Sequence, residues 1–339
     1  MSNDTKVARP AWLKTTRKYE QTDLRKAIWQ LTNTFLPYLA LWYVMIRTVQ
    51  LDYPYWMTLA LAVLAAALLA RIFIFFHDCG HGSFFASRRA RTILGYITGV
   101  LTFTPYQDWA HNHRIHHATA GDLDRRDVGD VWTMTVEEYR AAPRTRRIFY
   151  RLVRNPIFML GIGPVWVFLI SQRFPHKNAK RRERRSVLIT NLALLAILIL
   201  ASVTIGPWVY LLVQLPVILI VAAAGIWLFY VQHQFDGVYW ARHEEWDPIR
   251  ASLEGSSYYK LPKVLQWFTG NIGLHHIHHI RPRIPNYNLQ RCYDETPEFQ
   301  AVKPITLRTS LRSLWFNLYD EQSGKLVSFR ALKTLPQAG

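Results

Sequence analysis

Histidines are the residues of this chain whose type and spacing most clearly suggest chemistry. Thirteen occur among 339 residues, and most lie in three clusters, HDCGH at 77–81, HRIHH at 113–117 and HHIHH at 275–279. Residues three or four positions apart share one face of a helix. Each cluster can therefore direct two or three imidazoles at one centre. The residues with this spacing are His77, His81, His113, His116, His117, His275, His278 and His279.

A ninth candidate, His233, stands alone at the end of a long apolar run. Imidazole is a common ligand of zinc, copper and iron. A single histidine on an apolar face is more often structural, but two HxxHH motifs and one HxxxH are difficult to obtain by chance. Nine imidazoles exceed the need of one metal that keeps open coordination positions. The pattern therefore favours two metals with four or five ligands each.

The other four histidines lack the ligand spacing. His111 and His276 lie within clusters but off the ligand face, although His111 remains an alternative ligand. His176 and His243 lie in basic or polar loops, where we expect them to be solvated.

Polar groups that bind the second ring nitrogen commonly orient ligand histidines. Carboxylates and amides close to the clusters are candidates for this role, with helix capping or solvated charge as the alternative. The candidates are Asp78, Asn271 and the loop residues Asp122, Asp124, Asp127 and Asp130.

The elements that must position the histidines are long apolar segments. Four such segments approach the ~20 residues that cross a bilayer as a helix. They are expected at about 28–48, 55–76, 187–205 and 208–231. Short connections pair them into two hairpins. We therefore predict an all-α integral membrane fold, with four transmembrane helices in two hairpins and a cytoplasmic helical cap that holds the metals.

Two further apolar stretches, 92–106 and 156–172, are predicted to be interfacial or re-entrant. If only one of them crossed the membrane, the histidine clusters would be divided between its two sides. Arg71 is the only charged residue of its apolar run. It is either functional, as intramembrane charges commonly are, or it extends to the headgroups.

Charge placement predicts the orientation. The net charge is +18, although only 19% of residues are charged and half are hydrophobic. So few charged and so many apolar residues do not suit a nucleic-acid-binding protein. Lysine and arginine gather at the N-terminus and at 88–91, 144–154 and 173–185. Under the positive-inside rule, both termini and the long loops are cytoplasmic. We expect a cytoplasmic segment at 1–27, a membrane domain at 28–300 and a cytoplasmic segment at 301–339.

The chain has only two cysteines, Cys79 and Cys292, which is too few for a disulfide framework. This low number favours a reducing compartment. The polar N-terminus lacks the apolar core of a secretory signal peptide. A bacterial inner membrane is the expected location.

The clusters, read with their surroundings, resemble those of membrane fatty acid desaturases of the bacterial acyl-lipid type. The similar segments are HDCGHGSF at 77–84, HRIHH at 113–117 with the following GDLDRRDVGDVW, VQHQF around His233, and HHIHH with RPRIPNYNL at 281–289. The resemblance covers about residues 70 to 300. It implies a non-haem di-iron centre that uses O2 to introduce a double bond into a fatty acyl chain, in unsaturated fatty acid biosynthesis.

The resemblance also implies an acyl-lipid substrate and electrons from ferredoxin or cytochrome b5. The sequence shows neither the His-Pro-Gly-Gly motif of a fused b5 domain nor a GxGxxG dinucleotide motif. A separate electron donor is therefore expected, and no nucleic acid partner.

Two alternatives stay open. Related hydroxylases and carotenoid ketolases use similar histidine motifs, so the motifs leave the substrate open. A metal transporter would be expected to carry polar ligands at midplane depth. The segments 187–203 and 208–231 contain no histidine, which disfavours transport.

Overall fold

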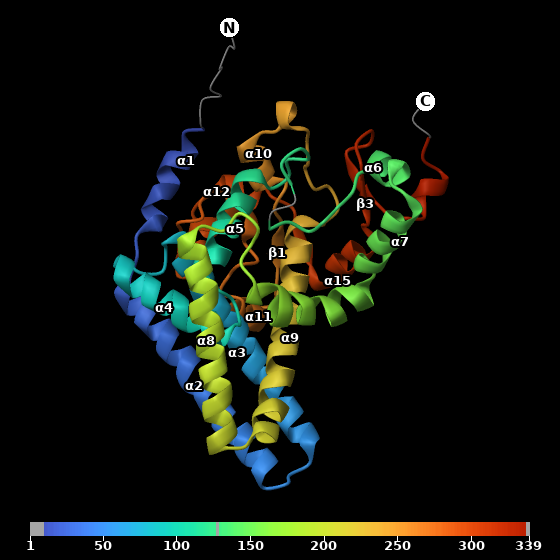
Figure 1. Ribbon diagram of the computed structural model, residues 1–339. Helices are drawn as coiled ribbons and strands as arrows, with labels where there is room; N and C mark the ends of the chain where they lie inside the picture. Colours follow the sequence, from blue (N-terminus) through green and yellow to red (C-terminus); the bar gives the residue numbers. More distant parts are fainter. Residues whose placement is uncertain (1–9, 127–128, 337–339) are drawn as a thin grey trace.

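Four long helices form a stem, and the shorter elements form a cap at one end of it (Figure 1). The computed structural model describes residues 10–126 and 129–336. The stem helices pack mainly on α3, which contacts both α2 and α9, whereas α8 lies beside α9. Their bounds are α2 Leu24–Gln50, α3 Tyr55–His81, α8 Arg181–Thr204 and α9 Pro207–His233.

The stem helices end where the local sequence requires it. At the cap end of α3, Gly82 has a φ of +75°, and its N–H bonds the carbonyl oxygens of Asp78 and Cys79. Because glycine adopts this left-handed conformation without strain, the helix stops directly after His81. Between α8 and α9, Gly206 has a φ of 90° and Pro207 is the first residue of α9. This tight turn makes the two helices antiparallel neighbours.

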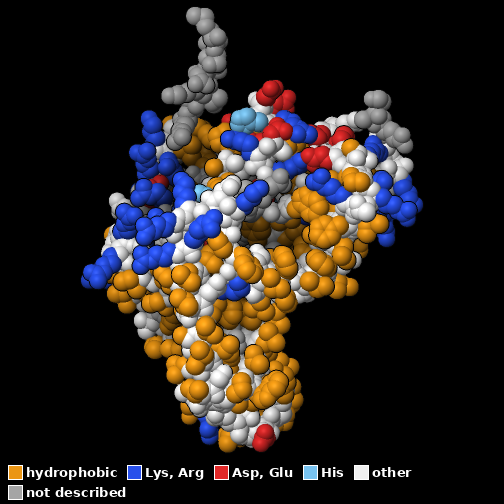
Figure 2. Space-filling view, viewed as in Figure 1, with side chains coloured by type: hydrophobic (Ala, Val, Ile, Leu, Met, Phe, Trp, Pro, Cys, Tyr) orange, Lys and Arg blue, Asp and Glu red, His pale blue; other side chains and the backbone are white. Residues whose placement is uncertain are grey.

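Three helices, α3, α8 and α9, are long and apolar enough to cross a membrane. A bent pair, α7 (Arg144–Val153) with Phe158–Arg173, gives a fourth if it is one span, although its parts meet at 66°. The predicted span at 28–48 lies within α2, which is long enough to cross a membrane but is not among these three apolar helices. Apolar side chains cover the visible face of the stem, and lysine and arginine gather where the stem meets the cap (Figure 2).

The two predicted interfacial stretches are helical and run across the stem rather than along it (Figure 1). Residues 92–106 belong mainly to α4 (Arg88–Leu101), and residues 156–172 form the π-helical segments η2 (Phe158–Ile162) and η3 (Val165–Ile170). A Cβ atom on Gly95 of α4 would lie 2.4 Å from the Tyr106 ring. Tyr106 in turn donates to the Cys79 carbonyl oxygen at 2.7 Å. This close packing fixes α5 (Tyr106–Thr119) against the end of α3.

The structure is mostly helical, as predicted, and within the described residues the cap adds four strands of three residues each. They form a parallel pair, β1 (Tyr258–Lys260) with β2 (Pro304–Thr306), and an antiparallel pair, β3 (Leu318–Asp320) with β4 (Lys325–Val327). Such three-residue strands carry no periodic signal in the sequence. The remaining cap elements are α1 Trp12–Thr15, η1 Thr16–Glu20, α5 Tyr106–Thr119, α6 Val136–Ala141, η4 Ser171–Arg173, η5 His243–Glu245, α10 Pro248–Leu253, α11 Lys263–Phe268, α12 His275–Ile280, α13 Asn286–Asp294, α14 Pro297–Gln300, α15 Leu307–Ser310, η6 Leu311–Trp315 and η7 Ala331–Lys333.

The C-terminal elements pack against the rest of the cap. The buried guanidinium of Arg154 donates to the Tyr230 hydroxyl at 3.0 Å and to the Phe316 carbonyl oxygen at 2.5 Å. The Tyr150 hydroxyl donates to the Asn317 carbonyl oxygen. Residues beyond 301 are thereby joined to α7 and α9.

Candidate metal centre

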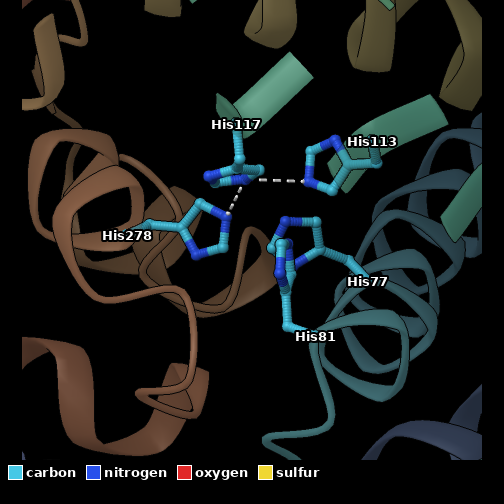
Figure 3. A group of neighbouring side chains, drawn as sticks. All are labelled: His77, His81, His113, His117 and His278. Atoms are coloured by element: carbon cyan, nitrogen blue, oxygen red, sulfur yellow. Dashed lines mark hydrogen bonds between the residues drawn. The ribbon is translucent and has the colours of Figure 1, made fainter. Parts of the chain in front are cut away.

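All nine histidines singled out by spacing and position come together in two groups. Within each group the potential ligand atoms lie within 4.8 Å of one another. The larger group is drawn in Figure 3, where its imidazoles point towards one another from three helices. The five-histidine group is His77, His81, His113, His117 and His278, and the four-histidine group is His116, His233, His275 and His279.

The helical spacing explains how the histidines are shared between the groups. His77 and His81 come from the last two turns of α3, and His233 from the last turn of α9. The HxxHH motifs of α5 and α12 each contribute to both groups. On α5, His113 and His117 join the larger group and His116 the smaller one; on α12, His278 joins the larger group and His275 and His279 the smaller. These two helices therefore place the groups side by side.

The distances between ring nitrogens suit shared metal ions. In the smaller group, the Nε2 atom of His233 lies 3.1 Å from that of His116 and 3.0 Å from that of His275. In the larger group, Nε2 of His117 lies 3.2 Å from that of His113 and 3.0 Å from that of His278. Two nitrogens that bind the same ion at about 2.1 Å, with a right angle between the two bonds, lie about 3.0 Å from each other. The observed separations match this value.

Burial keeps three imidazoles of the larger group neutral and leaves polar atoms of that group unsatisfied. Burial and neighbouring imidazoles hold the pKa of His113, His117 and His278 well below the usual value. A neutral imidazole has the lone pair that binds a metal. Within the described residues, buried Nε2 atoms of His77 and His81 have no hydrogen-bond partner. Because a buried polar atom without a partner is costly, metal ions at these positions would fit the residues present.

Hydrogen bonds on the far side of three rings fix their orientation. Nδ1 of His116 lies 2.5 Å from Oδ1 of Asp130, and Nδ1 of His77 lies 3.3 Å from Oδ1 of Asp78. Nδ1 of His233 lies 3.3 Å from the Gly255 carbonyl oxygen. A proton on Nδ1 that is donated to these oxygens leaves Nε2 free for a metal. Each group therefore has one histidine paired with a carboxylate.

Asn286 is a supporting residue that the sequence analysis did not identify. Its backbone N–H and its Nδ2 atom donate to Oδ2 of Asp78 at 2.8 and 2.9 Å. Asn271 donates to the Asn286 carbonyl oxygen at 3.0 Å, so it reaches His77 only through Asn286 and Asp78. The only signal for Asn286 was its place in the segment that follows the third cluster.

Two predicted supporting carboxylates lie elsewhere, which corrects their assignment. Asp122 accepts from Arg125 at 2.6 Å and pairs with Nδ1 of His243 at 2.8 Å. Asp124 accepts from Arg242 at 2.6 Å. Both carboxylates tie together two cap loops instead of orienting a clustered histidine. Asp127 lies outside the described residues.

The remaining histidines are outside both groups. His176, expected in solvent, is partly buried and pairs with Oδ1 of Asp108 at 2.7 Å. The ring of His111 stacks on His176, with centroids 5.1 Å apart, so His111 does not join the ligand groups. His276 is fully buried near Phe299, and burial lowers its pKa to about 4.

Apolar helices of membrane-crossing length, joined to a cap with two groups of buried histidines, define a class of metal-dependent integral membrane enzymes. The sequence model of the fatty acid desaturase family matches residues 54–309. A fatty acid desaturase of Bacillus subtilis is 49% identical over 318 residues, which cover 94% of this chain and 90% of that protein.

Two more distant relatives come from Synechocystis and Nostoc. An sn-1 oleoyl-lipid 12-desaturase of Synechocystis is 25% identical over 68% of this chain and 65% of that protein. An sn-1 acyl-lipid omega-3 desaturase (ferredoxin) of Nostoc is 26% identical over 74% of this chain and 69% of that protein. The chain belongs to the fatty acid desaturase family.

Proposed function

We propose that this desaturase introduces a double bond into the acyl chain of a membrane lipid, using two irons held by the two histidine groups and O2 as co-substrate. The adjacency of a five-histidine and a four-histidine group is the observation that carries the proposal. Imidazole ligands suit iron. The relatives in Synechocystis and Nostoc are named as an oleoyl-lipid and an acyl-lipid desaturase, which supports the substrate class.

Bound iron and O2 supply the oxidising power that removal of hydrogen from an unactivated methylene requires. The protein contributes position and exclusion of water. Asp78 and Asp130 hold protons on the far nitrogens of His77 and His116, which keeps Nε2 available. Trp109 stacks on His113 with ring centroids 4.3 Å apart. Phe229 packs on His116 and His233 at 5.1 and 5.3 Å, so apolar rings cover both groups.

The proposed topology has four spans, α2, α3, α8 and α9, in two hairpins, with 28–300 as the membrane domain. Both terminal segments and the cap lie in the cytoplasm, and the membrane is the bacterial inner membrane. The gathering of lysine and arginine at the cap end of the stem supports this orientation (Figure 2). The site would then lie just inside the cytoplasmic boundary, where an acyl chain can enter from the bilayer.

A separate protein of the ferredoxin or cytochrome b5 type is proposed as the electron donor. Support comes from the relative in Nostoc, whose name includes ferredoxin. The identity of the donor can be tested by adding each purified donor to the reconstituted desaturase.

Fatty-acid profiling tests the proposed function. A host that expresses the chain should accumulate unsaturated acyl chains in its membrane lipids, and a host carrying His116→Ala should not. Hydroxylated acyl chains or oxidised carotenoids in place of new double bonds would instead support the hydroxylase or ketolase alternative.

A further inference from the structure

A cavity of about 740 Å³ lies beside the metal-ligand helix α12, and none of the clustered histidines lines it. Its walls come from α2, α3, β1, α11 and the turn that precedes α12. Four cationic side chains line it: Lys26, Arg71, Lys260 and Lys263. No aspartate or glutamate is among the described residues that line it. The cavity is therefore strongly cationic and lacks an internal counter-charge.

Arg71 is the deepest of these cations and is held rigidly. It is 3% exposed, its Nε donates to the Thr34 hydroxyl at 3.1 Å, and its guanidinium lies 4.1 Å from the centre of the Trp267 ring. In the part of the chain that the structure describes, no carboxylate forms a salt bridge with it. Its hydrogen-bond partners, the Thr34 hydroxyl and the Trp267 carbonyl oxygen, are both neutral, and a buried charge is costly without an opposite charge. An anion in the adjacent cavity would provide that opposite charge.

The cavity also offers neutral polar groups and an amphipathic rim. Gln30 is buried, and its Oε1 atom has no hydrogen-bond partner in the described structure. At the rim, Trp29 is 67% exposed and Trp267 is 37% exposed. Exposed tryptophans are typical of the level at which lipid headgroups lie. The rim therefore suits a ligand that is part polar and part membrane-embedded.

We propose that this cavity binds the phosphodiester headgroup of a glycerophospholipid. Arginine and lysine supply the charge-assisted hydrogen bonds that phosphate oxygens prefer, and Gln30 offers an acceptor to a headgroup hydroxyl or amine. Gly273 and Leu274 line the cavity and directly precede His275. A headgroup bound here is held next to the helix that carries three of the clustered histidines.

This inference rests on the proposed function, because it identifies the headgroup of the lipid whose acyl chain is desaturated. Soluble thioesters such as acyl-CoA also carry phosphates. The exposed tryptophans and the apolar stem beside the cavity favour a phosphate that arrives in the membrane.

Binding of a spin-labelled phosphatidylglycerol tests the proposal. The iron-loaded protein is kept in a non-ionic maltoside, and the motionally restricted fraction of the spin label gives the Kd. Unlabelled phosphatidylglycerol should displace the probe, whereas glucosyl-diacylglycerol with the same acyl chains should not. Arg71→Gln should raise the Kd about fivefold, as about 1 kcal/mol per cation near a lipid surface implies.

The double variant Lys260→Gln/Lys263→Gln is a second test in case the Arg71 variant misfolds. Both lysines are exposed, so their replacement should not disturb the fold. This double variant should also raise the Kd by about fivefold or more. The matched control, Arg144→Gln/Arg147→Gln, removes two charges from α7 outside this cavity and should leave the Kd within about twofold.

Three results would overturn the proposal: equal displacement by glucosyl-diacylglycerol, equal weakening in the control variant, or displacement by stearoyl-CoA as strong as that by phosphatidylglycerol. Fatty-acid profiling of the same variants separates the two proposals. A wild-type protein that desaturates lipids but binds phosphatidylglycerol independently of these cations contradicts only the headgroup site. Cation-dependent binding without desaturation contradicts only the proposed function.

Discussion

His233 joins the four-histidine group from the last turn of α9, although no other histidine lies near it in the sequence. Its Nε2 atom lies about equally far from His116 and His275, at 3.1 and 3.0 Å. Because the Gly255 carbonyl oxygen faces the other ring nitrogen, the ring is oriented from both sides. These contacts make His233 the most informative single residue for testing the ligand set.

We expect His233→Ala to abolish desaturation while the protein still inserts and accumulates. Loss of a residue that hydrogen-bonds a metal ligand costs about 10–100-fold in metal affinity or activity. Loss of the ligand itself should cost at least as much. The measurement is the unsaturated fraction of host acyl chains, normalised to protein by immunoblot. His176→Ala and His243→Ala should retain most activity, and His276→Ala should be intermediate. Near-normal product from His233→Ala at equal abundance would mean that the three clusters suffice.

Asp130→Asn should weaken iron binding about 10–100-fold, as is usual for the hydrogen-bond partner of a ligand histidine. The amide can donate to Nδ1 of His116, which favours the tautomer with its proton on Nε2. The matched control is Asp124→Asn, because Asp124 lies in the same loop but bonds Arg242. Iron retained after dialysis against graded chelator gives the comparison. Equal retention in both variants would show that Asp130 does not orient the ligand.

At the residue scale, spacing predicted eight of the nine converging histidines, because residues three and four apart share a helical face, and the ninth, His233, was predicted from its place at the end of an apolar run. It could not divide them into groups. His116 and His117 are neighbours on α5 yet belong to different groups, which depends on how α5 crosses α3, α9 and α12. Asn286 could not be predicted either, because its contact with Asp78 joins residues 208 positions apart.

At the element scale, apolar length predicted the stem helices to within a few residues at most ends. The cap was harder to predict. Its helices α11 and α12 have six residues each, and its strands have three, too short for a periodic signal. Contacts such as that of Arg154 with Phe316 depend on the folded cap and not on local sequence.

The orientation of these elements can be measured by cysteine labelling. We expect Ile205→Cys, in the turn between α8 and α9, to react with an impermeant maleimide from the periplasm, and Asn178→Cys to be protected. Both native cysteines are buried, so the background should be low. Labelling at position 178 but not at 205 would reverse the proposed topology.

At the scale of the whole molecule, the stem and the cap meet at the two histidine groups. Helices α3 and α9 deliver ligands from the stem, whereas α5 and α12 deliver them from the cap. Metal binding should therefore hold the two parts together as well as supply the chemistry. The net charge of +18, gathered partly at this junction, suits a protein anchored in an anionic membrane surface.

The metal content of the purified protein tests the central claim most directly. Protein prepared from iron-replete cells should contain about two irons per chain by elemental analysis, because two separate groups of imidazoles suit two ions. His233→Ala should lose iron from the smaller group, whereas His243→Ala should retain both ions. One zinc per chain and no iron would contradict the account.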